Sequence, residues 1–339
     1  RDAQESRGLG DVYKRQVHYI LERFFGEYTK EEYLSLEEDK FQKIVCAYLA
    51  EYAVKYFGEE QLESNSFTYR LKTILDNVMY LMKHIMEELS QSEFFVADCE
   101  LKIGEDIPSY TIVLPDGHKI AVCGSVDRVD IMQRADITYL RIIDYKTGTK
   151  QFKLSDILYG INLQMLLYLH SIEASGGDKY GEIVPAGILY MPATVPYISS
   201  DSLKSIDKLP DELNKKLKMN GLLLKDTEII HGMDKTDVAT YIPVKIKAGE
   251  PVSSTSLATL AEFGKIFKKV DMLIAEMGKN IYNGNIEAKP LKGGHDSCEY
   301  CPYDSVCAYR QSNPITCFSV DNKTVIEEIT NEINGKEEE

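Results

Sequence analysis

The 339-residue chain lacks several features that would place it in a common class. No apolar run approaches the roughly 20 residues needed to cross a bilayer, and no signal-peptide pattern opens the chain, so neither a membrane partner nor export is expected. We find no internal repeat and no GxxxxGK[ST] phosphate loop. Any ATP hydrolysis must therefore take place on another chain or on a missing part of this one.

Positive charge is also scarce. The 39 lysines and arginines are outnumbered by 54 aspartates and glutamates, which gives a formal net charge of −15. This balance argues against a protein whose whole surface attracts nucleic acid, although it leaves room for a locally basic groove. Lysines recur at 146, 150 and 153, at 215, 216 and 218, and at 265, 268 and 269. The ordinary explanation of each run is a solvated helix face.

The hydrophobic fraction of 44% is typical of a globular protein with a large core, in one large domain or two smaller ones. Apolar spacing predicts helices over 17–57 with a break at Gly26, 66–91 with Ser66 as N-cap, 161–173, 210–218 and 257–281. Strands are predicted over 94–102, 110–114, 118–130, 138–145 and 182–191, with a hairpin turn at Asp116-Gly117. This order favours an α/β or α+β core. We expect residues 200–250 to be an insertion or extended loop and the tail after Val320 to be frayed.

The most informative segment is Gly124–Asp130 (GSVDRVD), followed by Asp144-Tyr145-Lys146. An antiparallel pair of strands would bring Asp127 and Asp144 to one end of a sheet, with Lys146 on the same face as Asp144. Two carboxylates can share a hard cation such as Mg²⁺, and the lysine can act on a nearby water or oxyanion. On spacing alone, a plain structural role is the more common explanation. However, Asp144 follows Ile142-Ile143, and an unpaired charge in such an apolar strand would be costly without a metal.

Five short motifs occur in the order found in one nuclease family. They are His18 in VHYILE, Glu100, GSVDRVD, IIDYKTG (142–148) and LQMLLYL (163–169). Together they resemble the RecB-like branch of the PD-(D/E)XK nucleases, and most of all the nuclease domain found in AddAB-type (RexAB-type) bacterial helicase–nucleases, on their AddB-type chain. The resemblance runs from about residue 17 to 310. It implies an α/β restriction-endonuclease-like core, a mixed central sheet flanked by helices, with a helical N-terminal part and a C-terminal cysteine cluster.

The resemblance also implies a set of site residues. Metal ligands would be His18, Asp127, Asp144 and the backbone carbonyl of Tyr145, and Glu100 would be a further catalytic acid near the metal. Lys146 would position or activate the attacking water. Gln164 and Tyr168 would support the site or contact DNA. Without the family, His18 is more often a surface or core histidine, Glu100 is an ordinary strand carboxylate, and helix packing explains Gln164 and Tyr168 equally well.

Seven cysteines are present, an odd number, and Cys298, Cys301 and Cys307 form a C-x2-C-x5-C cluster. Because no export signal is seen, we expect a reducing compartment and a metal or iron–sulfur site rather than disulfides. Three thiols are one ligand short, and Cys317, or His295 for zinc, could be the fourth. The resemblance implies a [4Fe–4S] cluster whose fourth cysteine lies upstream of the histidine helix. Cys46, Cys99 and Cys123 are expected in the core.

The expected organisation is a non-native or misassembled end at 1–16, a nuclease domain at 17–290, a cluster segment at 291–317 and an acidic tail at 318–339. The implied function is Mg²⁺-dependent hydrolysis of single-stranded DNA in the bacterial cytoplasm, while an AddA-like partner subunit unwinds duplex ends for repair and recombination. Two alternatives stay open. One is a stand-alone or CRISPR-associated RecB-like exonuclease, and the other is a non-catalytic DNA-binding or scaffold module with a zinc-stabilised C-terminus.

Overall fold

A six-stranded mixed sheet forms the centre of the protein in the computed structural model, which describes residues 9–62, 64–148, 151–195, 209–253, 255–299, 301–307, 309 and 314–337. Its strands lie in the order β1-β4-β5-β6-β7-β10. Their bounds are β1 Phe95–Ile103, β4 Gly124–Arg134, β5 Ile137–Lys146, β6 Glu182–Pro192, β7 Asn220–Leu224 and β10 Leu257–Ala258. The pairs β5–β6 and β7–β10 are parallel, and the other neighbours are antiparallel.

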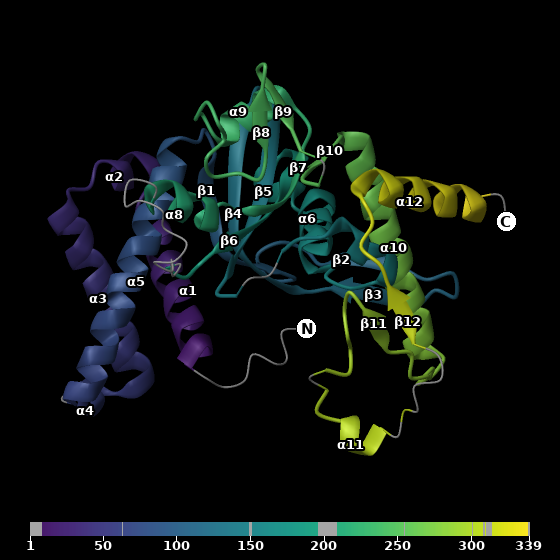
Figure 1. Ribbon diagram of the computed structural model, residues 1–339, viewed down its shortest axis with the longest axis horizontal. Helices are drawn as coiled ribbons and strands as arrows, with labels where there is room; N and C mark the ends of the chain where they lie inside the picture. Colours follow the sequence, from purple (N-terminus) through teal and green to yellow (C-terminus); the bar gives the residue numbers. More distant parts are fainter. Residues whose placement is uncertain are drawn as a thin grey trace.

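Helices cover both faces of this sheet (Figure 1). On one side lie α1 Leu9–Glu27, α2 Lys30–Leu34, α3 Glu38–Phe57, α4 Glu59–Leu62 and α5 Asn65–Ser90. On the other side lie the 3-10 helix η1 Leu154–Tyr159, α6 Gln164–Ser175, α7 Gly177–Tyr180, α10 Leu260–Tyr282 and α12 Asn322–Glu337. None of the helices in the described part of the chain is long and apolar enough to cross a membrane. The predicted fold class, a mixed sheet between helices, is confirmed.

Smaller elements complete the fold. The helices are α8 Leu209–Leu217, α9 Thr227–Met233 and α11 Asp304–Cys307. Three two-stranded sheets pair β2 Tyr110–Val113 with β3 Lys119–Val122, β8 Lys245–Lys247 with β9 Glu250–Val252, and β11 Leu291–Gly293 with β12 Ile315–Cys317. Because helices cover both faces of the main sheet, apolar side chains on both faces of its central strands are shielded from solvent, and Val129, Leu140, Ile142 and Leu189 are fully buried.

The N-terminal helices follow the predicted pattern, including the break near Gly26. Helix α1 ends at Glu27, and α2 begins after Thr29, whose side chain forms a capping box with Glu32. Residues 9–16 are the first part of α1, whereas 1–8 lie outside the described residues. The long amphipathic helix α5 is confirmed, but Ser66 is not its N-cap. Ser64 occupies that position, and the helix begins at Asn65.

The predicted strand 118–130 is wrong, because it is two strands in two different sheets. Strand β3 ends at Val122 and pairs with β2, and β4 begins at Gly124 in the main sheet. The predicted hairpin turn is confirmed between β2 and β3. There Gly117 has a φ of 87°, which glycine adopts without steric cost. The interruption at Cys123 allows β4 to enter the main sheet independently of the small hairpin.

Residues 209–250 are more regular than predicted. The short helix near 210–218 is confirmed as α8. However, β7 lies inside the main sheet between β6 and β10, so this part of the predicted loop belongs to the core. Residues 200–208 lie outside the described residues. That the region is an insertion relative to other proteins stays a prediction.

The C-terminal segment is also ordered, and the prediction of a frayed tail after Val320 is wrong for residues 322–337. Helix α12 packs against α10, with Val325 and Ile329 fully buried. Lys269 of α10 forms an ion pair with Glu332. Helix α10 itself begins at Leu260, after the short strand β10, with Thr259 in a capping box. Residues 338 and 339 lie outside the described part of the chain.

Candidate metal centre

The β4–β5 hairpin carries the two carboxylates that the sequence singled out. Ala135 and Asp136 form its turn, and Arg128 pairs with Ile143 near the open end. Asp127 and Asp144, the next residues along β4 and β5, therefore lie side by side at the open end of the hairpin, as expected for an antiparallel pair. Asp127 Oδ2 accepts a hydrogen bond of 3.0 Å from the backbone N–H of Tyr145. Lys146 Nζ lies 2.8 Å from Asp144 Oδ2, so the lysine and this carboxylate share one face.

Two residues from distant parts of the chain complete the cluster. His18, on α1, has its Nδ1 atom 2.7 Å from Glu100 Oε1 and its Nε2 atom 3.5 Å from Asp127 Oδ2. Its ring also meets the Tyr145 ring edge-on, with 5.8 Å between centroids. The structure thus brings His18, Glu100, Asp127 and Asp144 to one end of the sheet. Their individual roles stay predictions.

Glu100 reaches this cluster through an unusual backbone conformation. Its φ is 52°, inside a strand whose flanking residues, Cys99 and Leu101, pair regularly with Arg128 and Val126. A non-glycine residue in this region costs on the order of 1–3 kcal/mol, and such strain gathers at functional sites. The Glu100 carboxylate is held on both oxygens, by His18 and by the Ser125 hydroxyl, which donates to Oε2 over 3.0 Å. Ser125 was missed by the sequence reasoning.

The pKa values of the clustered residues reflect the crowding of several carboxylates around one histidine. The pKa of Asp127 is raised to about 6, because burial and the Asp144 charge together outweigh the opposing charge of His18. Burial alone would lower the pKa of His18, but its hydrogen bond to Glu100 and the charge of Asp127 outweigh burial and raise it. Burial alone would raise the pKa of Glu100, and His18 reverses that to a net lowering. A bound cation would offset this crowding of carboxylates.

The donor atoms fit a divalent cation. His18, Glu100 and Asp127 each offer a ligand atom within 4.8 Å of the others. His18 Nε2 is buried and has no hydrogen-bond partner among the described residues, whereas Nδ1 is held by Glu100. A histidine held this way through one nitrogen presents the other to a metal. Carboxylate oxygens with one imidazole suit Mg²⁺ or Mn²⁺.

Gln164 and Tyr168 lie on α6, and Tyr168 packs against Gly124 at the start of β4, three residues before Asp127. Gln164 is the first residue of α6, and its Nε2 atom donates to the Tyr168 hydroxyl over 3.4 Å. That hydroxyl packs against Gly124 so closely that a Cβ atom at this position would lie 2.1 Å from it. A side chain in place of the glycine of GSVDRVD would therefore displace the Tyr168 ring. The sequence reasoning did not assign the glycine this packing role, although its place in the motif was the available signal.

Directly behind the hairpin lies a group of four fully buried charges, Glu88, Arg128, Asp130 and Arg141, which we call the buried quartet. Arg128 Nε and Arg141 Nη2 lie 2.6 Å and 2.8 Å from the Asp130 carboxylate. Glu88, on α5, accepts from Arg128 over 3.1 Å and from Arg141 over 2.6 Å. The quartet ties α5 to the strands that carry Asp127 and Asp144. The sequence reasoning missed it, although charged residues inside apolar strands were its signal.

The cysteines are not gathered into a second centre. Cys298 and Cys301 are partly buried, Cys307 is exposed at the end of α11, and Cys317 is buried in β12. Among the described residues, the one group of three or more donors close enough to hold a metal is His18–Glu100–Asp127. Within the described residues no set of three or more thiols lies at metal-binding distance, and the iron–sulfur site stays a prediction. Residues 300, 308 and 310–313 of this segment lie outside the described residues.

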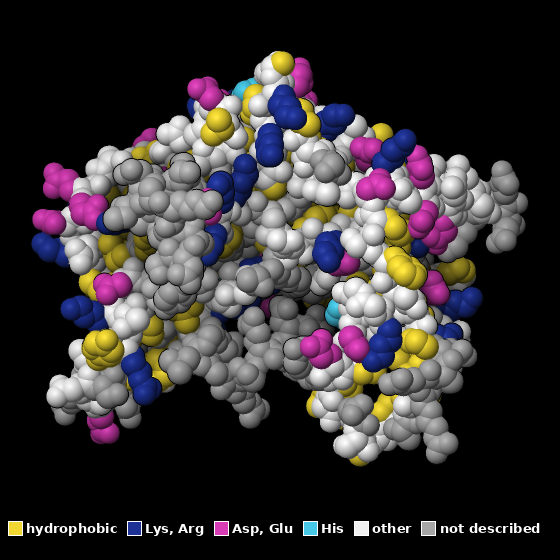
Figure 2. Space-filling model, in the orientation of Figure 1, with side chains coloured by type: hydrophobic (Ala, Val, Ile, Leu, Met, Phe, Trp, Pro, Cys, Tyr) yellow, Lys and Arg dark blue, Asp and Glu magenta, His cyan; other side chains and the backbone are white. Residues whose placement is uncertain are grey.

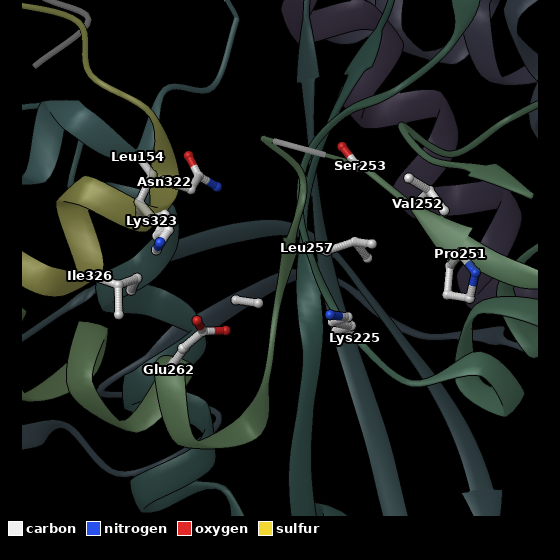
Figure 3. Close-up of a pocket in the computed structure, with 11 residues that line it drawn as sticks. Leu154, Lys225, Pro251, Val252, Ser253, Leu257, Glu262, Asn322, Lys323 and Ile326 are labelled. Carbon is white, nitrogen blue, oxygen red and sulfur yellow. The ribbon is translucent and has the colours of Figure 1, made fainter.

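Another hollow lies at the opposite edge of the sheet, beside β10 (Figure 3). Its lining comes from η1, β9, β10 and the first turns of α10 and α12. Glu262, the one carboxylate in its lining, is already bound to Thr259 in the capping box of α10. The hollow therefore offers no cluster of ligands, and the chemistry concentrates at the open end of β4 and β5.

Comparisons with known proteins agree with this geometry. The chain matches the PD-(D/E)XK nuclease superfamily over residues 8–308. The B subunit of the ATP-dependent helicase/deoxyribonuclease of Thermoanaerobacter sp. (strain X514) is 38% identical over 246 residues, which is 71% of this chain and 21% of that protein. The protein of the same name from Alkaliphilus oremlandii (strain OhILAs) is 32% identical over 335 residues, 94% of this chain and 29% of the relative. The Clostridium kluyveri (strain NBRC 12016) protein is 36% identical over 281 residues, 80% and 24% respectively. The chain thus spans between about a fifth and three tenths of the length of these relatives.

Proposed function

Because the chain belongs to the PD-(D/E)XK nuclease superfamily, we propose that it is a Mg²⁺-dependent deoxyribonuclease. Its substrate is single-stranded DNA, which a helicase partner supplies as it unwinds duplex ends in the bacterial cytoplasm. The proposal for the partner rests on the bacterial relatives, which are named as subunits of an ATP-dependent helicase/deoxyribonuclease. The [4Fe–4S] cluster on Cys298, Cys301 and Cys307 belongs to the same proposal, with no catalytic step assigned to it.

One observation carries the nuclease proposal: His18, three carboxylates and Lys146 converge on a site where His18 Nε2 has no other partner among the described residues. When bound there, Mg²⁺ neutralises phosphate charge and lowers the pKa of a bound water. His18, Asp127 and Asp144 would hold it. Glu100 fixes the orientation of the His18 ring through Nδ1, which keeps Nε2 directed toward Asp127.

Lys146 is the residue placed to act on the substrate. Its side chain is largely buried beside Asp144, and its Nζ atom also lies 5.5 Å from the centre of the Tyr190 ring. An ammonium held in this way can donate to a non-bridging phosphate oxygen or to the attacking water, and so stabilise the charge that develops during hydrolysis. Asp144 fixes the lysine in place and would ligate the cation with its carboxylate.

The acidic composition is compatible with a DNA substrate, because the positive charge is unevenly distributed. Figure 2 shows lysine and arginine side chains in a row from the β8–β9 hairpin toward α8, on an otherwise mixed surface. These two elements contribute Lys215, Lys216, Lys245 and Lys247. This row supports the locally basic surface that the net charge left open, and a polynucleotide backbone is attracted to such a surface.

The test is cleavage of an end-labelled single-stranded oligonucleotide by the purified full chain in Mg²⁺. We expect Asp144→Asn and Lys146→Ala to lower the rate by a factor on the order of 10² or more, because each removes a group that acts on the reacting phosphate. EDTA should abolish cleavage. Matched controls are Asp136→Asn, at the other end of the same hairpin, and Lys119→Ala, an exposed lysine on β3.

Equal cleavage by wild type and Asp144→Asn would show that the site is wrongly assigned. A wild-type protein that contains zinc and cleaves no DNA in Mg²⁺ or Mn²⁺ would instead favour the non-catalytic DNA-binding module.

A further inference from the structure

A groove opens beside the metal centre between α1, α3 and β1. Its lining includes His18 and Glu100 of the candidate site and three tyrosines, Tyr19, Tyr52 and Tyr56. It encloses about 470 Å³, within the roughly 300–1,000 Å³ of pockets that hold compact ligands. A ligand in this groove would therefore contact both the tyrosines and the residues that surround the metal.

The three tyrosines form one packed unit with a single well-exposed ring. Tyr52 is buried, and its ring centre lies 5.3 Å from that of Tyr19 and 4.5 Å from that of Tyr56. Tyr52 and Tyr56 are four residues apart on α3 and so share a face of that helix. Tyr56 is 55% exposed. Buried Tyr52 thus fixes in place a ring that is open to solvent at the edge of the groove.

A lysine lies next to this exposed ring. Lys55 Nζ is 5.3 Å from the centre of the Tyr56 ring and 5.4 Å from that of Tyr19. Contacts of this length are cation–π interactions, which hold the ammonium near the rings without neutralising it. Within the described residues, Lys55 makes no ion pair with a carboxylate. Its charge is therefore available to an anionic group that approaches Tyr56.

Nearby carboxylates do not cancel this charge. Glu51 accepts a 2.6 Å hydrogen bond from the Tyr19 hydroxyl and lies 3.8 Å from Arg23 Nη2, so its negative charge is partly offset. The groove lining itself carries both signs of charge: Glu22 and Glu100 are accompanied by Lys14, Arg15 and Lys102. An aromatic face beside lysines favours a ligand that combines a flat ring with a phosphate.

We propose that this groove binds the single-stranded substrate next to the scissile bond, with one base stacked on Tyr56 and a neighbouring phosphate contacted by Lys55. The proposal rests on the nuclease function proposed above and adds a reason for strand selectivity. In a duplex each base is stacked on its neighbours and its face is covered, so Tyr56 can stack only on a base that is unpaired and unstacked. Tyr56 and Lys55 are then positioning residues, which act on binding of the strand and not on the reacting phosphate.

The test measures affinity for fluorescein-labelled dT12 in Mg²⁺, with the full chain carrying Asp144→Asn to prevent cleavage. Tyr56→Ala should weaken binding about tenfold, the effect typical of losing one base–aromatic stack. Tyr56→Phe keeps the ring and should bind within about twofold of its parent. Tyr69→Ala is the matched control, because Tyr69 is an exposed aromatic residue on α5 that does not line the groove.

Lys55 has its own readout. Lys55→Ala should reduce the slope of log affinity against log salt by about 0.7, the value for one phosphate contact on a single strand. Affinity for a blunt duplex of equal length should stay within about twofold in Tyr56→Ala, because its bases are not free to stack. In proteins that retain Asp144, Tyr56→Ala should raise KM for dT12 and leave kcat unchanged.

The outcomes separate this proposal from the nuclease function. If Asp144→Asn abolishes cleavage but Tyr56→Ala binds dT12 as tightly as Tyr69→Ala, the stacking site is overturned and the nuclease stands. If Tyr56→Ala weakens single-strand and duplex binding equally, stacking is again overturned. If Asp144→Asn still cleaves while Tyr56→Ala loses dT12 binding and Tyr56→Phe keeps it, the stacking site stands and the catalytic assignment fails.

Discussion

The buried quartet behind the metal centre holds in place the strands that carry Asp127 and Asp144. The buried quartet contains two carboxylates and two guanidinium groups, all inaccessible to solvent, so its charges balance without water. Such a group contributes little net stability compared with an apolar core, but it penalises the loss of any one member. Glu88 connects α5 to both arginines of the hairpin. The position of Asp127, next to Arg128, therefore depends on a glutamate from another layer.

Glu88→Gln is expected to lower the free energy of unfolding by about 3 kcal/mol or more, since it leaves two buried arginines facing one carboxylate. Denaturant titration of the purified protein measures this loss. Glu87→Gln changes the exposed neighbour on the same helix and should shift stability by less than about 0.5 kcal/mol. Equal stability of the two variants would show that the quartet does not anchor the hairpin.

At the same scale, the sequence predicted some site residues better than others. Asp127, Asp144 and Lys146 could be brought together by reasoning on residues alone, because strand alternation and a short connection fix their geometry locally. His18 and Glu100 entered only through family resemblance. Their contact spans 82 residues, and it depends on the positive φ of Glu100, which no residue pattern signals. The quartet was missed because charged residues in a strand are usually assigned to a solvated face.

Among the elements, the contact of α6 with α10 is set by a charged histidine. His170 Nε2 lies 3.2 Å from Asp271 Oδ2 on α10 and 3.2 Å from the Tyr110 hydroxyl on β2, and its ring stacks on Phe267. Burial alone would lower the pKa of His170, but its hydrogen bonds to Asp271 and Glu173 outweigh burial and raise the pKa to about 9. Since α6 begins with Gln164 and carries Tyr168, this cluster also fixes the helix beside the metal centre.

A raised pKa means that the folded protein holds the His170 proton more tightly than the unfolded chain. The resulting stabilisation is fully present below about pH 6.5 and is lost as the pH rises through 9. We expect the stability advantage of wild type over His170→Gln to fall by about 1–2 kcal/mol between pH 6 and pH 10, a figure reduced for the partial exposure of the cluster. Denaturant titrations of both proteins at each pH measure it, and titration of Tyr110 largely cancels in the difference. An advantage that does not change with pH would contradict this account.

Most elements could be predicted from periodicity, and the failures have tertiary causes. The acidic C-terminal residues suggested fraying, but packing of α12 on α10, with Val325 and Ile329 buried, stabilises this helix. Strand β7 is only five residues long and contains a run of three leucines within a lysine-rich stretch, too short to stand out until β6 and β10 pair with it. At Cys123 the apolar pattern continues although the chain passes from one sheet to another, and alternation carries no information on which strand is the partner.

For the whole molecule, the net charge of −15 and the metal centre make separable contributions to stability. Any added salt screens the repulsion among the excess negative charges of the protein. A cation that binds the folded state but not the unfolded chain stabilises the fold additionally, by mass action. Mg²⁺ at ten times its dissociation constant would add about 1.4 kcal/mol, which for a chain of this size raises Tm by about 2 °C.

We therefore expect Mg²⁺ to raise Tm by about 2 °C more than NaCl of equal ionic strength does, with EDTA reversing the rise. Asp127→Asn should abolish this excess, and Asp136→Asn should keep it. Scanning calorimetry or dye-monitored melting measures each case. An excess that survives in Asp127→Asn would place the bound cation elsewhere.

The two-residue turn between β4 and β5 has a consequence for synthesis on the ribosome. His18, Glu100, Asp127, Asp144 and Lys146 all precede residue 147, so a nascent chain carries every proposed catalytic group before the other half of the sheet exists. A hairpin closes in about 1–10 μs, whereas β6 ends roughly 46 residues later, which at about 5–20 residues per second is a delay of several seconds. During that delay the second edge of β5 has no neighbour. The proposed catalytic groups are thus all synthesised before β6, the strand that pairs with the second edge of β5.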